Sequence, residues 1–196
     1  TNKGDRVGIL SPNCAEFVIS FYGIARIGAV VTTINSGYRE LEISHQINDS
    51  RCSVIIVHED LVPTLDKALF LSQLKPRIIT LGSDKSEFWN LIEAAPPMET
   101  EVEIDARNDL AALPYSSGTT GLSKGVMLSH FNLVSNVQQL VGLSGKAKFL
   151  HDDVVLVHLP LFHIYGMNVL MNGCIAVGAT QVMMGRFDMV EFLDLI

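Results

Sequence analysis

Residues 116–125 read Ser116-Ser117-Gly118-Thr119-Thr120-Gly121-Leu122-Ser123-Lys124-Gly125 and combine five hydroxyl side chains, three glycines and one lysine. Glycines allow sharp turns in which several backbone N–H groups point into one cavity. Hydroxyls add short donors, and a flexible lysine delivers a full positive charge. The mixture suits a phosphate or another dense anion, although a mobile linker or a plain turn can have a similar composition. It is not a Walker A loop, because that loop requires Gly-Lys-Ser/Thr and Lys124 here follows Ser123.

Short apolar segments frame this loop on both sides. Residues 109–115 (Asp-Leu-Ala-Ala-Leu-Pro-Tyr) predict a strand that enters it, and residues 126–128 (Val-Met-Leu) predict a strand that leaves it. Ser129 is the predicted N-cap of a helix over 129–141. These flanks favour an ordered phosphate loop over residues 115–125 rather than a linker.

Strand and helix patterns alternate along the chain. Strands are predicted at 6–10, 29–33, 53–57, 77–81, 154–157 and 180–184, and helices at 14–27, 38–48, 61–74, 87–94, 129–141, 166–176 and from Asp188 onward. In the helix 38–48 we expect Leu41, Ile43 and Ile47 to face the core. Residues 53–57 are apolar along their length, which is typical of a parallel sheet covered on both faces. The alternation predicts an α/β fold, a layered sandwich with a mostly parallel sheet.

Composition excludes several classes of protein. A net charge of -7 argues against a nucleic-acid partner. Three widely spaced cysteines and six histidines show no ligand spacing, so neither a disulfide framework nor a metal site is predicted, and a reducing compartment is expected.

Residues 154–185 contain no charged Lys, Arg, Asp or Glu, but Pro160 and several Asn and Gly residues interrupt them, so a buried helix and strand are predicted rather than a membrane span. No signal-like segment is seen at Thr1, so an intracellular location is expected.

Two motifs carry a resemblance to a known family. The loop sequence Ser-Ser-Gly-Thr-Thr-Gly-x-x-Lys-Gly-Val resembles the phosphate loop of the adenylate-forming (AMP-binding) enzymes, which include acyl-CoA synthetases, 4-coumarate–CoA ligases, luciferases and peptide-synthetase adenylation domains. Residues 159–167 (Leu-Pro-Leu-Phe-His-Ile-Tyr-Gly-Met) are similar to a second motif of that family, in its coumarate-ligase form. The chain departs from the family pattern at Ser123, where a proline is usual, and this change should make the loop more flexible.

The resemblance extends over nearly the whole chain and implies its domain organisation. Residues 1–141 are expected to form the first subdomain of a large N-terminal domain, and residues 152–196 to begin the second, with a ligand cleft between them. The family's C-terminal catalytic domain has no counterpart in this sequence. We therefore expect a fragment of a longer enzyme that is inactive by itself.

The resemblance also implies a two-step reaction and assigns residues to it. A carboxylic acid attacks the α-phosphate of ATP, which carries Mg²⁺, and the thiol of coenzyme A then displaces AMP from the acyl-adenylate. Lys124 and His163 are the implied catalytic residues, Arg186 is an implied coenzyme A contact, and His163 and Tyr165 border the implied acyl pocket. The implied phosphate-binding residues are Ser116, Ser117, Gly118, Thr119, Thr120, Gly121 and Lys124. By their residue types alone, His163 could be a structural histidine, Tyr165 a core residue and Arg186 a surface residue.

The expected function is that of an ATP-dependent acid–thiol ligase. Two alternatives remain open: a luciferase-like or peptide-synthetase-type adenylating domain, and a non-catalytic nucleotide-binding module. The acid is expected to be hydroxycinnamate-like or a medium to long aliphatic acid, and the location cytoplasmic or peroxisomal.

Overall fold

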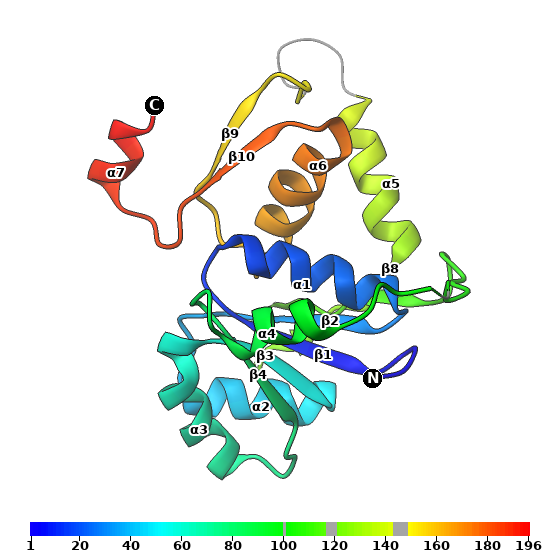
Figure 1. The fold of residues 1–196 in the computed structure, drawn as a ribbon, viewed down its shortest axis with the longest axis vertical. Coiled ribbons are helices and arrows are strands. Elements are labelled where there is room, and N and C mark those ends of the chain that lie inside the picture. The colour runs from blue at the N-terminus through cyan, green and yellow to red at the C-terminus, as the bar shows by residue number, and fades with distance from the viewer. Residues whose placement is uncertain (100, 117–120, 143–148) are drawn as a thin grey trace.

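The computed structural model describes residues 1–99, 101–116, 121–142 and 149–196 (Figure 1). The strands are β1 (Arg6–Leu10), β2 (Val30–Ile34), β3 (Val54–His58), β4 (Arg77–Leu81), β5 (Leu110–Ala112), β6 (Tyr115–Ser116), β7 (Lys124–Gly125), β8 (Leu128–Ser129), β9 (Val154–Val157) and β10 (Thr180–Met183). The helices are α1 (Ala15–Arg26), α2 (Glu40–Ser50), α3 (Val62–Leu71), α4 (Glu87–Ala94), α5 (His130–Val141), α6 (Gly173–Val177) and α7 (Met189–Asp194), with a 3₁₀ turn η1 (Glu59–Leu61) and a π-helix η2 (Tyr165–Asn172).

A six-stranded sheet forms the centre of the molecule, in the order β4-β3-β1-β2-β5-β8. Its strands are parallel except for β8, which runs antiparallel to β5. Helices α2 and α3 cover one face, and α1, α5 and η2 pack on the other (Figure 1). The predicted α/β sandwich with a mostly parallel sheet is confirmed.

The central strands are apolar along their whole length because each face of the sheet has its own core. In β3, Ile55 and Val57 join the cluster beneath α2 and α3, whereas Ile56 joins the cluster beneath α1. Burial on both faces removes the alternation of polar and apolar residues that a half-exposed strand would show.

Leu41 lies outside the core, contrary to the sequence-based expectation. Its side chain is 70% exposed, while Ile43 and Ile47 of the same helix are buried. Residues two apart in a helix point to nearly opposite sides, whereas residues three or four apart share a face. The face that contains Ile43 and Ile47 therefore turns Leu41 to solvent.

A separate pair of parallel strands, β9 and β10, follows the central sheet in the chain. The π-helix η2 and helix α6 connect these strands and pack toward α1 and α5 (Figure 1). The predicted helix 166–176 thus begins one residue earlier and has π geometry over its first eight residues. Among the described residues, no helix has the length and apolar character needed to cross a membrane.

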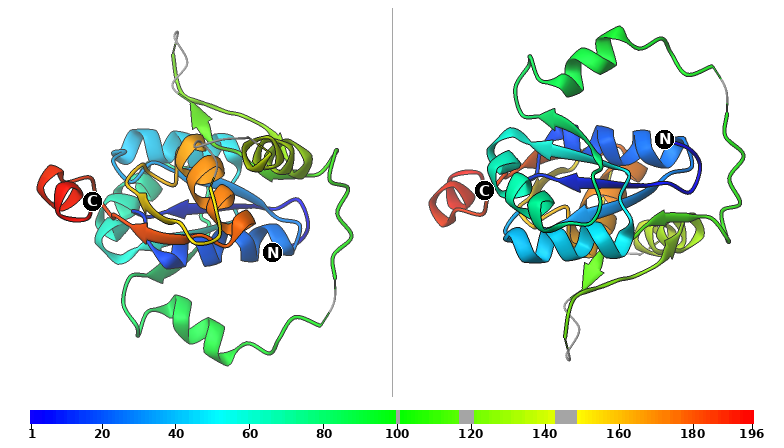
Figure 2. Two further views of the ribbon diagram at one scale, coloured as in Figure 1. Left: turned by 90° about the horizontal axis from the view of Figure 1, so that it is seen from above. Right: turned by 90° about the horizontal axis from the view of Figure 1, so that it is seen from below.

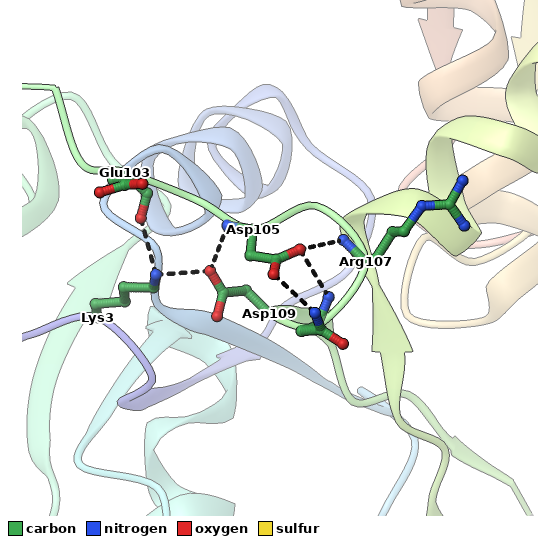
Figure 3. Close-up of polar contacts among 6 residues, drawn as sticks. Lys3, Glu103, Asp105, Arg107 and Asp109 are labelled. Carbon is green, nitrogen blue, oxygen red and sulfur yellow. Dashed lines mark hydrogen bonds and ion pairs between the residues drawn. The ribbon is translucent and has the colours of Figure 1, made fainter.

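Lys3 connects the N-terminal segment to the turn that precedes β5 through a hydrogen bond and an ion pair (Figure 3). Its ammonium donates to the carbonyl oxygen of Glu103 at 2.8 Å and pairs with the Asp109 carboxylate at 2.6 Å. Asp109 also accepts from the backbone N–H of Asp105 at 2.7 Å. The hydrogen bond from Lys3 lowers the pKa of Asp109, and the hydrogen bond from the Asn108 amide lowers the pKa of Asp105.

These lowered pKa values predict a specific loss of stability in acid. A carboxylate whose pKa is lower in the folded state stabilises the fold above its unfolded pKa, about 3.9 for Asp, and that contribution is lost as the pH falls through the folded value. Asp109→Asn should therefore flatten the decline of the unfolding free energy below about pH 5. Urea unfolding, followed by circular dichroism at a series of pH values, measures how the free energy of unfolding depends on pH. Lys3→Met, which removes the cation alone, should flatten the curve in the same direction, and identical pH slopes in all three proteins would contradict the prediction.

Candidate functional site

The two ends of the segment rich in glycine and hydroxyl residues pair as a short antiparallel hairpin, β6–β7. Tyr115 pairs with Gly125, and Ser116 pairs with Lys124. Because directly paired residues project from the same side of a hairpin, the Ser116 hydroxyl and the Lys124 ammonium share one face. Both residues are exposed. The predicted Ser117, Gly118, Thr119 and Thr120 lie outside the described residues.

Two glycines of this segment are required by the geometry of the hairpin. Gly121 has φ +136°, a conformation that other residues rarely adopt. A Cβ on Gly125 would lie 3.1 Å from the ring of Tyr115. The glycine pattern therefore serves the backbone turn and the packing of one aromatic ring.

A buried asparagine anchors the loop that contains His163. The amide nitrogen of Asn13 donates to the carbonyl oxygen of Leu159 at 3.0 Å and to that of Val157 at 3.3 Å, and its amide oxygen accepts from the N–H of Leu161 at 2.8 Å. Asn13 follows β1, so this bonding joins the end of a central strand to a loop nearly 150 positions later. Sequence reasoning missed this role, and the only signal was a polar residue in the turn that follows an apolar strand.

A threonine of β2 holds the same loop one residue before His163. The hydroxyl of Thr33 donates to the carbonyl oxygen of Phe162 at 2.8 Å. His163 itself is exposed, and its Nδ1 accepts from the N–H of Tyr165 at 3.3 Å. In a neutral ring this bond places the proton on Nε2, which remains available to a ligand.

Gly166 allows the loop to fold back onto the start of η2. A Cβ at this position would lie 2.1 Å from the carbonyl oxygen of Pro160, far inside contact distance. The Gly of the Leu-Pro-Leu-Phe-His-Ile-Tyr-Gly motif is therefore a steric requirement for placing His163.

A chain of side-chain hydrogen bonds holds η2 against α1 and α5. The Tyr22 hydroxyl donates to the amide oxygen of Asn172 at 2.8 Å, Asn172 donates to Asn168 at 2.9 Å, and Asn168 donates to Asn136 at 2.8 Å. Sequence reasoning treated Asn168 and Asn172 only as interruptions of an apolar run. Their spacing of one helical turn within that run was the available signal for a buried polar contact.

The base of the hairpin and the His163 loop border one cavity of about 300 Å³, which we call the hairpin cavity. Its lining includes Thr33, Tyr115, Ser116, Phe162 and His163. The structure thus brings two of the predicted site residues, Ser116 and His163, to the same hollow, although they lie 47 positions apart in the chain. Lys124 is not among the lining residues of this cavity.

A second hollow of about 1070 Å³, the strand-end cavity, adjoins the first through Asn35 and Phe162. Arg186 lines it, together with His58 and His158. Tyr165 is half exposed at the start of η2 and lines neither cavity. Of the predicted site residues that the structure describes, Ser116 and His163 therefore line the hairpin cavity and Arg186 lines its neighbour.

The fold of the chain, with its mostly parallel sheet, matches part of the N-terminal domain of adenylate-forming enzymes. The model of a family described as AMP-binding enzyme matches residues 1–196, the entire chain. The chain belongs to this family.

Individual relatives are similar to the chain over its full length. 4-Coumarate–CoA ligase 5 from Oryza sativa subsp. japonica is 41% identical over 197 residues, which cover 98% of this chain and 36% of that protein. A long-chain-fatty-acid-CoA ligase from Archaeoglobus fulgidus superposes with a TM-score of 0.89 at 30% identity, over 100% of this chain and 38% of that one. ATP-bound MatB from Rhodopseudomonas palustris gives a TM-score of 0.85 at 29% identity, again over 100% and 38%. The chain thus spans little more than a third of the length of these relatives.

The steric role of Gly166 gives a matched pair of substitutions. Gly166→Ala should destabilise the fold by about 1–3 kcal/mol, because the new methyl group collides with the backbone at Pro160. Gly23→Ala in α1 meets no atom within 4 Å and should instead stabilise by about 0.5–1 kcal/mol through helix propensity. Chemical denaturation of both variants measures whether each substitution lowers or raises the free energy of unfolding. Equal effects of the two substitutions would show that the contact at Pro160 does not constrain the loop.

Proposed function

We propose that this chain is part of an ATP-dependent acid–thiol ligase that activates a carboxylic acid as its acyl-adenylate and transfers the acyl group to coenzyme A. The observation that carries the proposal is the hairpin cavity, which Ser116 and His163 line from two separate segments. In the proposed organisation, residues 1–141 form the first subdomain and residues 152–196 begin the second.

The donors on the hairpin fit the departing pyrophosphate. Ser116 supplies a hydroxyl and Lys124 a positive charge on one face, and charge-assisted hydrogen bonds of this kind are the stronger ones. Donors aimed at oxygens that gain negative charge lower the barrier of the first step. Within the described ranges, no group of three or more His, Cys, Asp or Glu side chains could hold a metal ion, so Mg²⁺ is proposed to be bound through the phosphates of ATP.

The two cavities suggest where other substrates bind. His163 at the hairpin cavity is proposed to contact the reacting carboxylate, and Arg186 at the strand-end cavity to contact coenzyme A. Tyr165, which lines neither cavity, is proposed from its place in the motif to contact the acyl chain. The relatives named above as 4-coumarate–CoA ligase and long-chain-fatty-acid-CoA ligase support a hydroxycinnamate-like or aliphatic acid. ATP and coenzyme A are intracellular compounds, which suits a cytoplasmic or peroxisomal protein.

The function is tested with the full-length protein, ATP, coenzyme A and a panel of hydroxycinnamic, medium-chain and long-chain acids. Thioester formation with at least one acid is the expected result. Adenylation without transfer to coenzyme A would favour a different adenylating enzyme, and no ATP–pyrophosphate exchange with any acid would reject the proposal. The isolated 196-residue chain is expected not to reach the ATP–pyrophosphate exchange rate of the full-length enzyme.

Lys124→Ala in the full-length protein should slow adenylation about 10²–10³-fold, because one donor to the developing charge is lost. The fold should be unaffected, since Lys124 is exposed. Lys67→Ala, which removes an exposed lysine from α3, is the matched control and should retain normal adenylation. Unchanged exchange kinetics in Lys124→Ala would remove this residue from the site.

A further inference from the structure

Helix α2 touches both strands of the hairpin through two side chains on one helical face. The Nε2 atom of His45 lies 2.9 Å from the carbonyl oxygen of Ser123, directly before β7. Because a carbonyl oxygen can only accept, Nε2 is the donor. Four residues further on, the Asp49 carboxylate accepts from the hydroxyl of Tyr115 in β6. Figure 2 shows the hairpin leaving the body of the molecule beside α2 in both views.

Aromatic packing reinforces these two bonds. The rings of His45 and Tyr115 meet edge to face, with centroids 6.4 Å apart and planes at 86°. On its other side the Tyr115 ring lies against Gly125 of the opposite strand. Burial and the neighbouring Asp49 raise the pKa of Tyr115, so its hydroxyl stays protonated and remains a donor.

The hairpin needs this external support because each of its strands has only two residues. A two-stranded hairpin is marginally stable by itself in water, even when it is much longer. Contacts with a packed helix are therefore needed to fix the direction in which Ser116 and Lys124 point.

Helix α2 is itself bonded to the strand that holds the His163 loop. The amide nitrogen of Gln46, which is fully buried, donates to the Thr32 hydroxyl at 2.9 Å and to the carbonyl oxygen of Thr33 at 3.0 Å. The Thr33 hydroxyl in turn holds the carbonyl of Phe162, the residue before His163. One continuous set of hydrogen bonds thus runs from the hairpin through α2 and β2 to the His163 loop.

We infer that α2 sets the position of the hairpin relative to His163, and that His45 and Asp49 are positioning residues for the binding of the ATP phosphates. The inference rests on the function proposed above, because it requires that the hairpin holds those phosphates. Neither residue contacts the nucleotide; each acts through the hairpin strand that it holds.

The test compares two half-reactions of the full-length protein, using the acid that gives the fastest exchange. His45→Ala and Asp49→Ala should lower kcat/KM for ATP in pyrophosphate exchange by about tenfold to a hundredfold, the usual consequence of a misplacement of about 1 Å. Thioester formation from supplied acyl-adenylate and coenzyme A should stay close to the wild-type rate, because that step does not use the pyrophosphate donors.

Conservative variants and a double mutant identify the bonds responsible. His45→Gln keeps a hydrogen-bond donor and Asp49→Asn keeps an acceptor, so both variants should recover most of the kcat/KM for ATP that the alanine variants lose. Tyr115→Phe combined with Asp49→Ala should cost no more than the more damaging single substitution, because both remove the same hydrogen bond.

Asn48→Ala is the matched control on the same helix. The Asn48 amide oxygen accepts from the Ser72 hydroxyl at 2.8 Å and from the N–H of Gln73 at 3.1 Å, so it bonds the segment that follows α3 and not the hairpin. This variant should lower the thermal stability and leave kcat/KM for ATP unchanged.

If the wild-type enzyme is active, any one of three results would overturn the inference. They are unchanged ATP kinetics in both alanine variants, equal losses in the two half-reactions, or the same ATP defect in Asn48→Ala. A wild-type protein that catalyses no exchange with any acid would overturn the proposed function, and the inference would fail with it.

Discussion

The buried amide of Asn13 is the contact on which the arrangement of the site depends. It bonds three backbone groups around Leu159 and Leu161, and it is the side chain at the end of β1 that joins the central sheet to the later part of the chain. A buried polar group that loses its partner costs about 1–3 kcal/mol, so the loop cannot shift without leaving several groups unsatisfied. These bonds, together with the one from Thr33 to Phe162, hold the loop that carries His163.

Both cavities form where parallel strands end. Asn13 and Asn35 follow β1 and β2, His58 is the last residue of β3, and all three line the strand-end cavity. His158 and Arg186, which follow β9 and β10, line it from the other side. Parallel strands end at the same edge of a sheet, so binding residues gather there without any need for proximity in sequence. The two sheets therefore turn their carboxyl ends toward a common hollow.

The sequence predicted those parts of the structure that local chemistry determines. β1, β4, β9 and α4 have the predicted bounds, and Ser129 and Asp188 cap their helices as expected, because apolar runs and capping side chains act over a few residues. Leu41 was assigned to the wrong face because it was grouped with Ile43, although residues two apart in a helix point to nearly opposite sides. The contacts of Asn13, Thr33 and His45 join segments far apart in the chain, and a single sequence contains no local pattern for them. The motifs pointed to Ser116 and His163, but only the fold placed both beside one cavity.

The π geometry of η2 makes this helix sensitive to changes in length. A π-turn contains one more residue than an α-turn, so this segment can absorb a one-residue deletion only by relaxing to α geometry. A change in length that is not absorbed in this way would rotate the part that follows by about 100° per residue. Asn172 would swing away from Tyr22, and the polar contact between η2 and α1 would be broken. Insertions and deletions among natural homologues should therefore be rarer within residues 165–172 than in surface loops, which generally tolerate them.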